Sequence, residues 1–212
     1  MKKYQYFLFD WDGCLVDTLS IWLDAYRKVF SEFHVQAPDR DIVDKMFGDW
    51  NGSLKFGIKN VTLFNEKLMA YVNANMTNVQ LHSGVLSTLK RIKDEMKKIA
   101  VISSSKRNTV MSAMNSKNIS PYVDLVLAEE DVSHHKPHPE VIEKALSFFK
   151  GKKSEAVIIG DTEKDIQAGK NAGIDTILFF PEINNTYYDK KKLLSFKPTY
   201  VLEEFTQILL KV

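Results

Sequence analysis

Five short apolar runs alternate with longer amphipathic segments, and this alternation constrains the fold more than any other feature of the chain. The apolar runs cover residues 4–9, 99–102, 123–127, 156–159 and 176–180. Each run is almost entirely apolar and too short for an ordinary helix, which is typical of a strand that is buried on both faces. Strands that alternate with helices are joined by right-handed crossovers. We therefore predict an α/β fold with a doubly wound, mostly parallel sheet.

One long segment after the first strand interrupts this alternation. Residues 19–33, 42–46 and 64–72 carry apolar side chains at helical spacing, and the stretch 47–53 contains two glycines and is expected to form a loop. The next strand-helix unit begins near residues 82–84. The sequence thus predicts a small helical domain, residues 17–81, inserted into a core domain made of residues 1–16 and 82–212.

The charge balance and the single cysteine exclude several classes of protein. The 29 basic and 27 acidic side chains leave a net charge of +2, which provides no basic surface for nucleic acid or an anionic membrane. One cysteine, Cys14, permits no internal disulfide and suits a reducing compartment, so we expect a cytoplasmic protein. A membrane span would need about 18 consecutive apolar residues, and the first apolar run ends already at Asp10.

Polar side chains follow the predicted strands at the points where each strand ends. They are Asp10 and Asp12 after the first strand, Ser103, Ser104 and Ser105 after the second, Asp161 and Asp165 after the fourth, and Lys136 in the loop before the third core helix. Ligands of open parallel sheets bind at this edge. Converging carboxylates need a cation between them, and oxygen-rich clusters suit Mg²⁺. Hydroxyls and N–H groups that open a helix suit phosphate. The set predicts a phosphoryl-transfer site.

The ordered set of motifs resembles the haloacid dehalogenase superfamily along the whole chain. The four matching stretches are Phe9-Asp10-Trp11-Asp12-Gly13, Val101-Ile102-Ser103, Lys136-Pro137 and Gly160-Asp161-Thr162-Glu163-Lys164-Asp165. A helical insert after the first motif is similar to the subgroup of phosphoglycolate phosphatase and β-phosphoglucomutase. This resemblance implies a Rossmann-like sheet in the strand order 5-4-1-2-3, with the insert as a cap domain over the site.

The resemblance also implies a role for each motif residue. Asp10 would attack phosphorus and form an aspartyl-phosphate, and Asp12 would protonate the leaving alkoxide and then deprotonate the hydrolytic water. The phosphoryl group would be bound by Ser103, by the N–H groups of Trp11 and Ser104, and by Lys136. Mg²⁺ would be held by the Asp10 carboxylate, the Asp12 backbone carbonyl, Asp161 and, directly or through water, Asp165.

Differences from individual members of the superfamily favour hydrolysis of a phosphate. Dehalogenases do not use an aspartate at the position of Asp12 as an acid, because their reaction has no alkoxide to protonate. Phosphonatases replace this aspartate by a small residue and add a lysine in the cap. β-Phosphoglucomutase carries a histidine where this chain has Trp22 and an arginine where it has Asn51. A phosphatase is therefore the expected activity, with mutase-like phosphoryl transfer as the alternative. A non-catalytic regulatory or binding protein on the same fold is a second alternative.

The substrate is less constrained than the chemistry. The candidate specificity residues of the cap are Trp50, Asn51, Gly52 and Lys55. One lysine with an aromatic ring and an amide favours a small, polar phosphate, and phosphoglycolate, a sugar phosphate, a nucleotide and pyrophosphate all remain open.

We expect a monomer or weak homodimer. Cys14 is expected to pack in the core, and the histidines at 134, 135 and 138 have no regular zinc-ligand spacing.

Overall fold

A six-stranded parallel sheet forms the centre of the molecule in the computed structural model, which describes residues 4–47 and 49–211. The strand order β3-β2-β1-β4-β5-β6 confirms the predicted α/β fold and contains the expected order 5-4-1-2-3. The strands are β1 (Tyr6–Asp10), β2 (Lys98–Ile102), β3 (Leu125–Leu127), β4 (Ala156–Gly160), β5 (Asp175–Phe179) and β6 (Tyr200–Leu202).

The sequence did not predict β6, which extends the sheet beyond β5. This strand is only three residues long, and its middle residue Val201 is exposed. An edge strand pairs on one side only and needs no continuous apolar run, so its signal is weak. Two predicted strands also begin later than expected, β1 at Tyr6 and β3 at Leu125.

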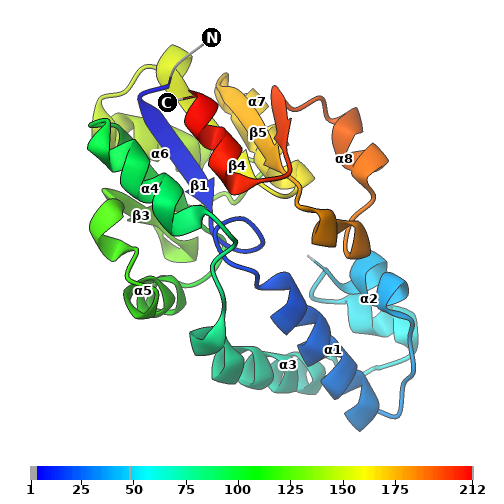
Figure 1. The fold of residues 1–212 in the computed structure, drawn as a ribbon. Helices are drawn as coiled ribbons and strands as arrows, with labels where there is room; N and C mark the ends of the chain where they lie inside the picture. The colour runs from blue at the N-terminus through cyan, green and yellow to red at the C-terminus, as the bar shows by residue number, and fades with distance from the viewer. Residues whose placement is uncertain (1–3, 48, 212) are drawn as a thin grey trace.

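Alternate residues of each central strand pack against different helices, which explains why the strands are apolar throughout. Phe7 and Phe9 share an apolar cluster with α4 (Val85–Asp94), α5 (Arg107–Ser116) and the 3₁₀ segment η7 (Phe205–Lys211). Leu8 belongs to another cluster, with α6 (Glu140–Phe149) and α7 (Glu163–Ala172). Figure 1 shows these helices on the two faces of the sheet.

The inserted segment forms helices α1 (Leu19–Glu32), α2 (Asp39–Met46) and α3 (Val61–Asn75), and it contributes most of a separate apolar cluster. Two short 3₁₀ segments, η1 (Gly52–Phe56) and η2 (Met76–Asn78), complete it, so part of the expected loop 47–53 is helical. These helices lie together beyond one edge of the sheet (Figure 1). The chain enters and leaves side by side, because Val16 bridges Leu81 and the N–H of Asp17 donates to the Gln80 carbonyl over 2.9 Å.

A segment after β5 also contacts the inserted helices, although it lies far from them in the sequence. It comprises η6 (Glu182–Thr186), two consecutive tyrosines and α8 (Lys190–Ser195). Tyr187 is buried in the apolar cluster of the inserted helices. In Figure 1 this orange segment lies between the sheet and α2. The remaining 3₁₀ turns are η3 (Ser120–Tyr122), η4 (Glu129–Asp131) and η5 (Lys153–Glu155).

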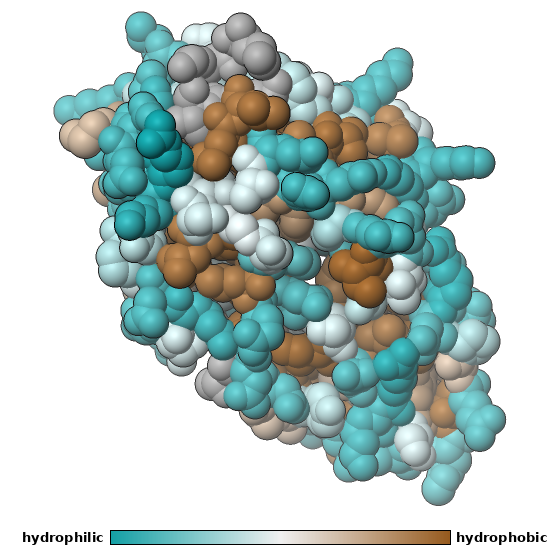
Figure 2. Space-filling model, viewed as in Figure 1, coloured by the Kyte–Doolittle hydropathy of each residue, from teal (hydrophilic) through white to brown (hydrophobic). Residues whose placement is uncertain are grey.

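The surface carries both hydrophilic and apolar side chains. On the face shown in Figure 2, hydrophilic side chains cover most of the area and apolar residues form separate small groups among them. None of the described helices has the length and apolar character that crossing a membrane requires.

Candidate active site

Lys136 joins the first and fourth motifs at the carboxyl edge of the sheet. Its Nζ donates to Asp10 Oδ1 and to Asp165 Oδ1, each over 2.6 Å, and all three side chains are at most 9 % exposed. Asp10 ends β1, whereas Asp165 lies in the first turn of α7. The parallel sheet brings the two segments to one place because β1 and β4 are neighbours. Three residues that the sequence predicted as site residues thus form one buried ionic group.

Burial and charge control the ionisation of this group. Burial raises the pKa of Asp10 above its usual value, and the neighbouring Lys136 opposes that rise. Burial alone would lower the pKa of Lys136, but the Asp10 and Asp165 carboxylates raise it above its ordinary value. The lysine therefore remains a cation and holds at least one partner as a carboxylate. This is the charge arrangement that an attacking carboxylate beside a phosphoryl group requires.

Asp161 completes the acidic cluster directly after β4 and is fully buried. Its pKa is raised, by burial first and then by the charges of Asp10 and Asp165. Gly13 lies against it in the left-handed region, with φ of +78°. A Cβ atom at this glycine would lie 2.3 Å from Asp161 Oδ2, so only glycine permits this approach.

Oxygen atoms of Asp10, Asp161 and Asp165 all lie within 4.8 Å of one another, which fits a single small cation. Asp161 Oδ1 is buried without a hydrogen-bond partner among the described residues. An orphaned carboxylate oxygen in a cluster of three acids has the chemistry of a ligand for a hard cation, and Mg²⁺ prefers such oxygen ligands. The residues present therefore fit the expected metal.

The Asp165 carboxylate accepts more hydrogen bonds from the protein than the Asp161 carboxylate does. Its Oδ1 accepts from Lys136, and its Oδ2 accepts from the Thr162 hydroxyl over 2.7 Å and from the Thr162 N–H over 3.2 Å. Gly160 permits this packing, because a Cβ there would lie 2.3 Å from Asp165 Cγ. Both oxygens thus have protein donors, whereas Asp161 keeps one oxygen available.

Asp12 lies two residues after Asp10, and Ser105 orients its carboxylate. The Ser105 hydroxyl donates to Asp12 Oδ2 over 2.6 Å, while Oδ1 is buried without a partner among the described residues. Burial raises the pKa of Asp12, and the hydrogen bond from Ser105 partly offsets the rise. A carboxyl group with a raised pKa and one free oxygen is suited to hold and release a proton.

The predicted phosphate-binding groups lie at neighbouring strand ends. Ser103 follows β2 and is buried, and its Oγ accepts from the Ser105 N–H over 2.9 Å. Ser104 is exposed at the turn before α5. Trp11 is fully buried, and its backbone carbonyl accepts from the Leu15 N–H in the turn that follows β1.

The predicted specificity residues lie between α2 and α3 and interact mainly with other residues of the inserted segment. Trp50 is 56 % exposed, and its ring meets the Trp22 ring edge to face at 6.3 Å. Lys55 donates to Asp49 Oδ2 over 2.8 Å, and the Asn51 N–H donates to Asp49 Oδ1. Gly52 is buried: a Cβ there would lie 2.3 Å from the Lys45 carbonyl oxygen. Among the described residues, no hydrogen bond or ion pair joins these four to the acidic cluster.

Two histidines on the loop that carries Lys136 and a glutamate at the start of α6 also come together. They are His134, His138 and Glu140. The Glu140 carboxylate already accepts from the Ser133 and His134 N–H groups and pairs with Lys144, so its oxygens are occupied by protein donors. This cluster therefore lacks the free carboxylate oxygen that Asp161 offers.

Cys14 packs in the core, as the sequence predicts. It is fully buried in the apolar cluster that lies against β1, and burial raises its pKa well above the usual value. A thiol in this environment stays protonated and is not a nucleophile.

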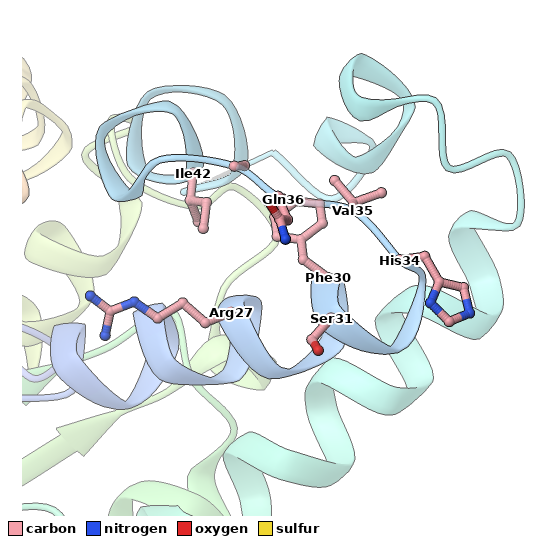
Figure 3. A pocket seen from close by; sticks show the side chains of 8 residues that line it. Arg27, Phe30, Ser31, His34, Val35, Gln36 and Ile42 are labelled. Carbon is pink, nitrogen blue, oxygen red and sulfur yellow. The ribbon is translucent and has the colours of Figure 1, made fainter.

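A cavity of about 470 Å³ lies between α1 and α2, where Arg27 and His34 are at opposite ends (Figure 3). Its arginine is already paired with Asp24 and Asp39, so the cavity offers no free guanidinium for an anion. The cavity is lined by residues of the inserted segment alone and takes no part in the acidic cluster.

From the sequence, Ser105 was only one of the hydroxyls after the second strand, and Thr162 and Tyr188 had no assigned role. The hydrogen bond from Ser105 to Asp12, 93 residues away, had no sequence signal, whereas Thr162 lies inside the fourth motif beside Asp161. Tyr188 gave no signal, yet its hydroxyl donates to Asp161 Oδ2 over 3.1 Å. Only the path of the chain after β5 brings this tyrosine to the end of β4.

Curated relatives match almost the whole chain. The "Pyrophosphatase PpaX" of Bacillus mycoides is 27% identical over 98% of this chain and 96% of its own length. The protein of the same name from Halalkalibacterium halodurans is 28% identical over 95% of this chain and 94% of its own.

Solved structures share the fold. A HAD family hydrolase from Deinococcus radiodurans, solved with bound phosphate and sodium, has a TM-score of 0.85 at 20% identity over 98% of this chain and 94% of that one. A predicted phosphoglycolate phosphatase from Haemophilus somnus has a TM-score of 0.84 at 19% identity over 99% and 98% of the two chains. The family model "Haloacid dehalogenase-like hydrolase" matches residues 7–179, a span that includes all four motifs. The chain therefore belongs to the haloacid dehalogenase-like hydrolases.

Proposed function

We propose that the protein is a Mg²⁺-dependent phosphatase that hydrolyses a small phosphate through an aspartyl-phosphate on Asp10. The observation that carries this proposal is the buried group in which Lys136 donates to both Asp10 and Asp165, with Asp161 beside them. A carboxylate at a strand end, a lysine bound to it and a free oxygen for a cation are the parts that phosphoryl transfer needs. The family and the names of the curated relatives support this assignment.

Asp10 and Asp12 divide the chemistry. Asp10 attacks phosphorus while Asp12, with its raised pKa, gives its proton to the leaving oxygen. Asp12 is then a carboxylate and takes a proton from the water that hydrolyses the aspartyl-phosphate. Ser105 holds the Asp12 carboxylate in one orientation through both steps.

Lys136 and Ser103 bind the transferring group. The ammonium offsets the combined negative charge of Asp10 and the phosphoryl oxygens, and the Ser103 hydroxyl donates to one of those oxygens, with the N–H groups of Trp11 and Ser104. The cation would be held by Asp10, the Asp12 backbone carbonyl and Asp161. Asp165, with both oxygens bound to protein donors, would act through water. When bound, Mg²⁺ supplies positive charge beside the phosphoryl oxygens.

Water, rather than a second sugar hydroxyl, is the acceptor that we favour. The position where the mutases carry a histidine is Trp22, whose ring packs on Trp50 and cannot serve as an acid or base. Residues 17–81 would act as the cap that selects the substrate. Relatives named pyrophosphatase and a structure named phosphoglycolate phosphatase make pyrophosphate and phosphoglycolate the first substrates to compare.

A hydrolysis screen tests the proposal directly. Phosphate release is measured for pyrophosphate, phosphoglycolate, sugar phosphates, nucleotides and p-nitrophenyl phosphate, in Mg²⁺ and after metal removal with EDTA. We expect release that EDTA abolishes and Mg²⁺ restores, and that Ca²⁺ fails to restore because its looser coordination misplaces the nucleophile. Undiminished activity after metal removal would contradict the metal assignment, and no release from any phosphate would contradict the function.

A further inference from the structure

Tyr188 is the one described side chain that donates a hydrogen bond to Asp161. Lys136 donates to Asp10 and Asp165, so it leaves Asp161 without an ammonium partner. The Tyr188 hydroxyl occupies Oδ2 over 3.1 Å, while Oδ1 is buried without a partner. One oxygen of the carboxylate thus has a protein donor, and the other has no partner among the described residues.

The ring of Tyr188 is held from two sides. It packs against the apolar cluster of β5 and α8, which contains Leu178 and Phe180, and also against the cluster of the inserted helices. Its neighbour Tyr187 is buried in the second cluster. A side chain fixed in this way places its hydroxyl without loss of further rotamer freedom when the carboxylate binds a ligand.

We propose that Tyr188 is a positioning residue for the metal: its hydroxyl orients the Asp161 carboxylate so that Oδ1 faces the cation. The inference rests on the proposed function, because it assumes that Asp161 is a ligand. Groups that hydrogen-bond to a metal ligand fix the orientation of that ligand, and their loss costs about 10–100-fold in metal affinity. Tyr188 thereby links the segment after β5, and the cap cluster it contacts, to the metal.

The test compares two tyrosine variants that each lose one oxygen atom. Tyr188→Phe removes the hydrogen bond and keeps the ring, whereas Tyr187→Phe removes a hydroxyl from the adjacent ring in the cap cluster. Binding of Mn²⁺ to the metal-stripped protein is followed by electron paramagnetic resonance without substrate, and Mg²⁺ is measured by competition. Circular dichroism confirms that both variants are folded.

We expect Tyr188→Phe to weaken Mn²⁺ and Mg²⁺ binding about tenfold, and Tyr187→Phe to change it less than about threefold. In hydrolysis, the Mg²⁺ concentration for half-maximal rate should rise for Tyr188→Phe, while kcat in saturating Mg²⁺ and the substrate KM stay near the wild-type values. A merely structural role would not separate these quantities.

The outcomes distinguish the inference from the proposed function. Wild-type protein that binds Mn²⁺ and hydrolyses phosphates, with Tyr188→Phe less than about threefold weaker in metal binding, overturns the inference alone. An equal loss in both variants overturns it as well, because the effect would then come from the cap cluster. Wild-type protein that takes up no Mn²⁺ overturns both the inference and the metal-dependent function.

Discussion

The sheet edge and the inserted helices use charged residues in opposite ways. At the sheet edge, Lys136 pairs with carboxylates that are 126 and 29 residues away, and all are buried. In the inserted helices, Lys45 pairs with Asp41 and Lys55 with Asp49, and these side chains are 40–51% exposed. Exposed local pairs contribute little to stability, whereas buried pairs are costly to break. The difference teaches that the fold fixes the buried ionic group at the sheet edge, whereas the exposed pairs of residues 17–81 can be replaced at little cost in stability.

We expect the largest loss of activity from a substitution of Asp10, the proposed nucleophile. Asp10→Asn should keep the fold and lower kcat more than about 10³-fold on every substrate, because an amide does not attack phosphorus. The measurement is steady-state hydrolysis of three natural phosphates and p-nitrophenyl phosphate. Asp94→Asn, on the exposed face of α4, is the matched control and should keep wild-type kcat. A variant at Asp10 that retains most of its turnover would rule out the covalent mechanism.

Lys136→Ala should cause the second-largest loss of activity, and it should also lower the stability of the fold. Loss of its ammonium should lower kcat/KM on all substrates by about 10²–10³-fold, since one donor to the phosphoryl oxygens is removed. It also leaves two buried carboxylates without their cation, so the free energy of unfolding should fall by about 3 kcal/mol.

Lys55→Ala is the comparison for stability. It breaks an exposed pair and should cost less than about 1 kcal/mol. Urea unfolding of both variants in EDTA measures the contrast. Equal losses of stability would show that the buried and exposed pairs do not differ as we describe.

Cap substitutions should redistribute activity among substrates and not abolish it. Trp50→Ala and Lys55→Ala should change relative kcat/KM values by about 10–100-fold, or about 1.4–2.8 kcal/mol. Turnover of p-nitrophenyl phosphate should fall much less, because an activated ester needs little help from remote contacts. Uniform losses on all substrates would show that this loop does not select the substrate.

The smallest expected effect concerns Ser105. Ser105→Ala removes the hydroxyl that donates to Asp12, and kcat should fall about tenfold, the value of one hydrogen bond to a charged group. Ser105→Thr keeps a hydroxyl and should recover most of the rate. If Ser105→Ala hydrolyses natural phosphates at the wild-type rate, Asp12 needs no such support.

Strand ends were predictable because their signals are local. Asp10, Ser103 and Asp161 each stand at the end of an apolar run, and a parallel sheet brings the carboxyl ends of its strands to one edge. Contacts that depend on the path between elements were not predictable. Tyr188 reaches Asp161 only because the chain after β5 turns back toward β4. The edge strand β6 was missed because three residues, one of them exposed, carry no periodic signal.

The pairing of the two chain segments at Val16 and Leu81 makes the insert exchangeable in principle. Antiparallel partners hold their Cα atoms roughly 5 Å apart. The residues between Val16 and Leu81 therefore form a closed loop on the core domain, whatever their number. The entropy of closing a loop grows only slowly with length, so longer or shorter inserts cost the core little. A chimera that joins the insert of another hydrolase at these two residues would bring a different recognition surface, and the new insert would also have to accept Tyr187 and Tyr188, which pack in the apolar cluster of the present one.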